Sequence, residues 1–127
     1  MRLGYRDFCG MNDFKDLIVW QKSMLLVDQV YAMGKLVPWR EAPGFYSQLT
    51  RAAISIPANI SEGYGRFSTK EYRRFLRISL GSSYELETLL IIGRNRGWFR
   101  NQEEQTNKFL KEVQKMLFTI IKRLPVD

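Results

Sequence analysis

The chain of 127 residues contains no histidine and only one cysteine, Cys9. Without imidazole there can be no histidine-activated serine or cysteine nucleophile, no HExxH zinc site and no Glu-x-x-His di-iron site. A single cysteine excludes an internal disulfide and a cysteine-rich zinc site, and it is typical of a reducing compartment. The sequence therefore predicts a protein that is not an enzyme and that carries no metal and no cofactor.

Long apolar runs are also missing. No stretch reaches the roughly 18 apolar residues that a membrane span requires, and the N-terminus lacks the apolar centre of a secretory signal. We therefore expect a soluble, cytoplasmic protein with no membrane partner. At 15.0 kDa the chain is long enough to bury one core. We expect an N-terminal tail over residues 1–12, with Met11 as an alternative start, and one domain over residues 13–127.

Acidic residues are scarce compared with basic ones. The chain has 13 aspartates and glutamates against 20 lysines and arginines, which gives a net charge of +7. Twelve of the basic residues are arginines. Such a balance favours an anionic partner such as RNA, although a basic surface alone would give the same composition.

Apolar residues recur at helical spacing in four segments, and none alternates as a strand would. The predicted helices cover residues 16–36, 44–63, 69–95 and 102–124. Ser68 with Glu71 forms a capping box for the third helix, and Asn101 with Glu104 forms a weaker one for the fourth. Because the connections are short, the sequence predicts an all-α fold, an antiparallel up-and-down four-helix bundle.

A proline, Pro57, lies in the middle of the second predicted helix. Proline removes one backbone donor and clashes with the carbonyl group four residues earlier, so we expect this helix to kink there or to start afresh. The residues around it are small enough to let another helix come close; they are Ala52, Ala53, Ser55, Ala58 and Ser61.

The first predicted helix carries two apolar rows about 120° apart at 100° per residue. The first row consists of Leu17, Trp20, Met24, Val27 and Tyr31. The second consists of Leu26, Val30, Met33 and Val37. A lone bundle buries one row of each helix, so we interpret the second row as an interface with another subunit. The alternative is that Trp39, Phe45 and Tyr46 fold across it.

The third helix carries a basic face opposite its apolar one. Lys70, Arg73, Arg74 and Arg77 follow the spacing i, i+3, i+4 and i+7, and Arg66 lies just upstream. This density of positive charge can neutralise several phosphates without sequence preference. We take these five residues as candidate nucleic-acid contacts, the alternative being an ordinary solvated face.

A family resemblance rests on a set of short motifs. These are Phe14-Lys15-Asp16-Leu17, Val19-Trp20, Gln48, Arg51-Ala52-Ala53, Ser55-Ile56-Pro57, Asn59-Ile60, Glu62-Gly63, Gly81-Ser82 and Glu85-Leu86-Glu87. Over about residues 14–99 the chain resembles the intervening-sequence proteins of the large-subunit ribosomal RNA, a four-helix-bundle family similar in fold to the accessory variability protein of diversity-generating retroelements. The resemblance implies a cyclic homopentamer and RNA as a plausible partner, but no reaction.

The polar members of these motifs are Arg51, Asn59, Glu62, Glu85 and Glu87. We expect structural roles for them, with Arg51 paired to one of the glutamates and with Asn59 and Glu62 satisfying backbone groups near the proline and the helix end. A general acid–base pair is the alternative, but no nucleophile accompanies the carboxylates. Beside RNA binding, a second hypothesis is a structural adaptor whose oligomer surface recruits a protein partner.

Overall fold

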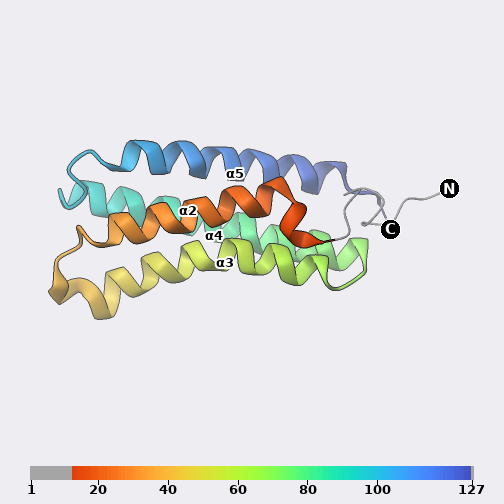
Figure 1. Ribbon diagram of the computed structural model, residues 1–127, viewed down its shortest axis with the longest axis horizontal. Helices are drawn as coiled ribbons and strands as arrows, with labels where there is room; N and C mark the ends of the chain where they lie inside the picture. The colour runs from red at the N-terminus through yellow and green to blue at the C-terminus, as the bar shows by residue number, and fades with distance from the viewer. Residues whose placement is uncertain (1–12, 127) are drawn as a thin grey trace.

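The structure, a computed structural model, describes residues 13–126, which form helices and turns without a strand. Within this part of the chain, four long helices run antiparallel along the molecule (Figure 1). They are α2 (Ile18–Gly34), α3 (Ser47–Tyr64), α4 (Thr69–Asn95) and α5 (Glu103–Arg123). Both α2 and α4 pack against α3 and α5, so the four helices enclose one core. The predicted up-and-down bundle is confirmed, and the predicted tail with Cys9 lies outside the described residues.

Three short helical pieces lie outside the long helices. They are η1 (Phe14–Asp16), η2 (Trp39–Glu41) and the π-helical turn η3 (Ala42–Tyr46). The Asp13 carboxylate caps η1 by accepting a hydrogen bond from the Lys15 backbone N–H at 2.9 Å. η3 leads directly into α3, so the helical path starts with a wider π-helical turn and then becomes α-helical.

One of the two predicted caps is confirmed. The Ser68 hydroxyl accepts a hydrogen bond from the Glu71 backbone N–H at 3.2 Å, at the start of α4. The cap predicted at Asn101 is wrong, because α5 begins at Glu103 and is preceded by Gln102, which makes no side-chain cap bond. Asn101 has a φ of 66° and belongs to the turn instead.

Pro57 lies inside α3, as the sequence predicts, and helical structure continues on both sides of it. Next to it, the Ser79 hydroxyl of α4 donates to the Ile56 carbonyl oxygen at 2.7 Å. The hydroxyls of Ser55 and Ser82 also lie 2.7 Å apart across the two helices. Small residues thus bring α3 and α4 within hydrogen-bonding distance beside the proline.

The faces that α4 and α5 turn to the core are apolar. On α4 the buried residues include Tyr72, Phe75, Leu76, Leu86 and Leu90, and on α5 they include Leu110, Val113 and Leu117. Gly63 of α3 lies so close to α4 that an added Cβ would stand 2.6 Å from the Cβ of Phe75. The two helices therefore approach closely at the turn that joins them.

The prediction that the second apolar row of the first helix contacts another subunit is wrong, whereas the first row is only partly buried. The row predicted to contact another subunit is buried in the core of the single chain; it consists of Leu26, Val30, Met33 and Val37. In the other row, Met24 and Tyr31 are each 41% exposed. The core row also includes Ser23, whose hydroxyl donates to the Trp20 carbonyl oxygen at 2.8 Å. That bond lets a polar residue lie in the core. A serine in this row does not look like a core residue in the sequence.

The three aromatic residues between α2 and α3 do not lie together over the buried row of α2. Trp39 is exposed. Phe45 packs edge-on against Trp98, with ring centroids 5.1 Å apart, and Tyr46 packs edge-on against Tyr31 at 6.5 Å. Phe45 therefore covers one end of the bundle, and Tyr46 covers part of the more exposed row of α2.

Candidate nucleic-acid interface

The turn between α3 and α4 brings most of the predicted basic residues together at one end of the bundle. The turn is short, because α3 ends at Tyr64 and α4 begins at Thr69. Arg66 lies in the turn, and Lys70, Arg74 and Arg77 follow on the exposed side of α4. Figure 1 shows this turn at the end of the bundle where the described chain also begins and ends.

A buried phenylalanine orients two of these arginines. The guanidinium carbon of Arg74 lies 4.5 Å from the ring centroid of Phe75, and that of Arg66 lies 5.1 Å from it. Cation–π contacts of this kind contribute about 0.5 to 1 kcal/mol at exposed sites. Phe75 therefore holds two positive charges from different elements next to each other.

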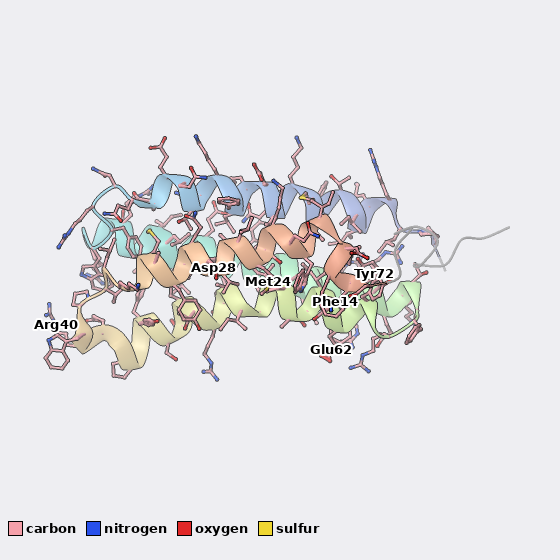
Figure 2. All side chains as sticks on the ribbon, viewed as in Figure 1. Phe14, Met24, Asp28, Arg40, Glu62 and Tyr72 are labelled. Atoms are coloured by element: carbon pink, nitrogen blue, oxygen red, sulfur yellow. The ribbon has the colours of Figure 1, made fainter. Side chains whose placement is uncertain are left out.

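The same two arginines are partly neutralised by carboxylates. Arg66 pairs with Glu62 at 3.3 Å and Arg74 with Glu71 at 3.0 Å. The hydrogen bond from Arg74 lowers the pKa of the Glu71 carboxyl below its ordinary value, and the same bond raises the pKa of Arg74. Figure 2 shows Glu62 on the outer side of α3, near the turn. Both carboxylates reduce the positive charge that a partner would meet.

Two of the predicted contacts form no ion pair with a carboxylate in the described part of the chain. Lys70 and Arg77 are exposed, and within residues 13–126 neither forms an ion pair. They lie seven positions apart, two helical turns along the same face. These two side chains are the strongest candidates for phosphate contacts.

Arg73 is bonded within the fold, so it is a weaker candidate for a phosphate contact than Lys70 and Arg77. One Nη of its guanidinium donates to the carbonyl oxygens of Leu124 at 2.9 Å and Pro125 at 2.7 Å. These are groups at the C-terminal end of α5, where carbonyls lack intrahelical partners. Arg73 thereby connects α4 to the last described residues.

The motif residues Arg51, Asn59 and Glu85 do not form a common site. Arg51 is exposed and, among the described residues, has no ion pair, so the predicted pairing with a glutamate is wrong. Asn59 donates to the carbonyl oxygen and the hydroxyl of Ser55, at 2.8 and 2.9 Å, which confirms a structural role. Glu85 is exposed.

Glu87 has a clear structural role between α4 and α5. It accepts hydrogen bonds from Lys111 Nζ at 2.7 Å and from Gln114 Nε2 at 2.9 Å. These two bonds lower the pKa of Glu87, the one from Lys111 more than the one from Gln114. The carboxylate therefore joins two neighbouring helices.

The site also contains a residue that the sequence reading missed. The Phe67 ring lies in the α3–α4 turn, is 65% exposed and follows Arg66 directly. Its φ is 56°, in the left-handed region that residues other than glycine rarely adopt. The sequence signal was the segment Gly63–Phe67, in which two glycines mark a turn that ends in an aromatic residue.

A shallow apolar groove of about 330 Å³ lies between η1, α2 and α3. Its lining residues are Phe14, Trp20, Met24, Ile54, Pro57, Ala58 and Ser61. Figure 2 shows Phe14 and Met24 on the side of α2 that faces α3. Since none of these residues is charged, the groove is a candidate contact surface for another apolar face.

Two further observations limit the chemistry of the part of the chain that the structure describes. Between residues 13 and 126, no three histidine, cysteine or acidic side chains gather where they could hold a metal ion. No helix in the same range is long and apolar enough to span a membrane.

The fold places the chain among up-and-down four-helix-bundle proteins. Residues 15–119 match the model of the 23S rRNA-intervening sequence protein family, and the chain belongs to that family. A similar solved structure is a protein of unknown function of the S23 ribosomal protein family from Bacteroides thetaiotaomicron, with a TM-score of 0.71 and 27% identity over 83% of this chain and 99% of that one. A search of the curated proteins found no match.

Proposed function

We propose that this protein is a non-enzymatic helical bundle that assembles into a cyclic homo-oligomer, a pentamer, and binds RNA or another polyanion through the α3–α4 turn. The observation that carries the proposal is the exposed pair Lys70 and Arg77, which form no ion pair within the described chain, beside Arg66 and Arg74. The family name, which refers to 23S ribosomal RNA, supports RNA as the polyanion.

The spacing of these charges suits a phosphate backbone rather than a small anion. Lys70, Arg74 and Arg77 project from one face of α4 over two helical turns, about 10 Å at 1.5 Å per residue. Successive phosphates along a strand can meet such a row, with no base recognised. Binding of this kind weakens steeply as salt rises, because each neutralised phosphate releases condensed counterions.

A salt titration of RNA binding tests the proposal. Log affinity should fall linearly with log salt, and the double change Lys70→Gln with Arg77→Gln should make the slope shallower by about 1 to 2. The matched control is Lys108→Gln with Lys115→Gln, which removes the same charge from exposed positions on α5. Equal slopes for the two double variants would contradict the proposed site. No RNA binding at low salt would leave the adaptor hypothesis.

A second variant tests the same site in the opposite direction. Glu62→Gln with Glu71→Gln removes the two carboxylates that pair with Arg66 and Arg74. Two more cations then become available, so we expect tighter RNA binding and a steeper salt slope. Unchanged binding would mean that these arginines do not face the RNA.

The apolar groove supports the oligomer. Copies with a net charge of +7 repel one another, so burial of apolar surface between them would offset that repulsion. The groove and its rim offer such a surface, since Met24, Tyr31 and Ile54 are each about two-fifths exposed. We therefore assign the interface to this more exposed row of α2 and to the facing side of α3.

Light scattering of aspartate variants tests the assembly. Met24→Asp should leave the helices folded but reduce the mass in solution toward 15.0 kDa. Leu26→Asp should instead unfold the chain, because it puts an unpaired charge into the core. A wild-type protein that is monomeric when dilute would disprove the oligomer.

A further inference from the structure

A ring of more than two copies needs two different contact surfaces on each copy. In such a ring one patch of a chain meets a different patch of the next chain, whereas a dimer can use the same patch twice. The groove between η1, α2 and α3 offers one surface. Because α2 and α4 each pack against both α3 and α5, the seam between α4 and α5 lies on the opposite side of the bundle from this groove. A ring whose grooves all face one neighbour turns this seam toward the other neighbour.

Two half-exposed aromatic rings lie along the α4–α5 seam. Tyr84 of α4 is 51% exposed, and Phe118 of α5 is 52% exposed. Across the seam, the Glu87 carboxylate accepts a hydrogen bond from Gln114 Nε2 at 2.9 Å. Tyr84 is three positions before Glu87, and Phe118 is four positions after Gln114, so each ring lies one turn from this bond on the same helix face. Because α4 and α5 are antiparallel, these two steps lead to the same level of the bundle (Figure 1).

The charges beside the groove and beside the two rings have opposite signs. Lys122 Nζ lies 5.5 Å from the ring centroid of Phe118. On α2, Asp28 follows Met24 by four positions and precedes Tyr31 by three, and Figure 2 shows it next to Met24. Asp28 and Lys122 are exposed, and neither forms an ion pair within residues 13–126. Opposite charges favour contact between the two surfaces and fix its orientation.

We propose that the ring closes head to tail, with Tyr84 and Phe118 of one copy packed into the α2–α3 groove of the next and with Lys122 facing Asp28. This rests on the proposed cyclic oligomer and goes beyond it by assigning the surface that fills the groove. Aromatic rings suit this groove, because it is shallow and its lining is uncharged and largely apolar. The partner of the groove is therefore a different side of a second copy of this chain.

Light scattering of aspartate variants tests the second surface. Phe118→Asp and Tyr84→Asp should each keep the helical circular dichroism signal, because both side chains are half exposed. Each should lower the mass in solution toward 15.0 kDa, since a charge would enter the apolar contact. The matched control is Leu25→Asp, which places the same charge at a side chain of α2 that is 50% exposed but does not line the groove. It should assemble as the wild type does.

An exchange of charges tests the orientation of the contact. Asp28→Lys and Lys122→Asp should each weaken the assembly, since each sets like charges against each other. Both changes in one chain restore opposite charges at every contact, so the double variant should regain the wild-type mass. Net charge alone predicts a different result, because Lys122→Asp lowers the net charge of +7 by two and would then strengthen the assembly.

The results separate this inference from the oligomer on which it rests. A wild type that is monomeric when dilute disproves the oligomer itself. If Met24→Asp disperses the assembly while Phe118→Asp and Tyr84→Asp do not, the oligomer stands and the head-to-tail contact is overturned. A double charge variant that stays dispersed overturns it as well. If one aspartate variant at the seam loses its helical signal, the other variant and the charge exchange decide.

Discussion

The turns that follow α3 and α4 each contain a phenylalanine close behind the helix end, but the two rings lie in opposite environments. After α3, Phe67 is 65% exposed; after α4, Phe99 is fully buried. Phe99 lies against Gly93, where an added Cβ would stand 2.2 Å from the ring. The comparison separates an aromatic residue that is packed inside the bundle from one that lies mostly at its surface.

The cations at the two ends differ in a similar way. At the α3–α4 end, Arg66 and Arg74 are held against Phe75 and paired with carboxylates. At the other end, Arg94, Arg96 and Arg100 are exposed and, among the described residues, form no ion pair. Positive charge alone therefore does not distinguish the two ends.

The sharpest way to test the comparison is to remove each ring. Phe99→Ala should lower the free energy of unfolding by about 3 to 5 kcal/mol, because it empties a fully buried site. Phe67→Ala should change it by no more than about 0.5 kcal/mol. Urea denaturation followed by circular dichroism measures both. Similar losses from the two variants would show that the Phe67 ring also supports the fold.

Glycine substitutions test how tightly each turn is packed. Gly63→Ala and Gly93→Ala should each cost about 1 to 3 kcal/mol, since the added methyl groups would meet Phe75 and Phe99. Gly81→Ala is the control, because its Cβ would meet nothing within 4 Å. It should stabilise the protein by about 0.5 to 1 kcal/mol through helix propensity. A harmless Gly63→Ala would contradict the close approach of α3 and α4.

Variants of Arg73 and Arg77 test which basic residues stabilise the fold and which bind RNA. Arg73→Gln removes the bonds to the carbonyl oxygens of Leu124 and Pro125, so we expect a loss of about 1 to 2 kcal/mol in the free energy of unfolding. The salt slope of RNA binding should stay unchanged. Arg77→Gln should give the reverse pattern, a shallower slope with little change in stability. Thermal unfolding and the RNA titration together distinguish the two roles.

The smallest effect is expected in the middle of the bundle, where Glu87 joins α4 to α5. Its pKa is lowered in the folded protein, so the stability it contributes is present above the ordinary pKa of 4.5 and is lost as the pH falls through the lowered value. Glu87→Gln should cost about 0.5 to 1 kcal/mol at neutral pH and nothing in strong acid. Urea titrations at several pH values measure this. Glu85→Gln, at an exposed position on the same helix, is the matched control.

Most residues of the candidate site could be predicted from the sequence. Which of them bond within the fold could not. The spacing of Lys70, Arg74 and Arg77 places them on one helix face in any bundle. The same spacing includes Arg73, whose guanidinium instead donates to carbonyl oxygens at the end of α5. A contact between residues 51 positions apart depends on how two helices align, and the helical period says nothing about it.

The sequence by itself determined the number, order and extent of the long helices, because periodic apolar faces, turn residues and the Ser68 cap are local signals. Only the tertiary structure decided which row of α2 is core, since Leu26 is buried by its neighbours in space. Only it brought Arg66 and Arg74 onto Phe75 and left the ring of Phe67 exposed. Burial depends on which surfaces meet, and that is settled by the packing of all four helices together.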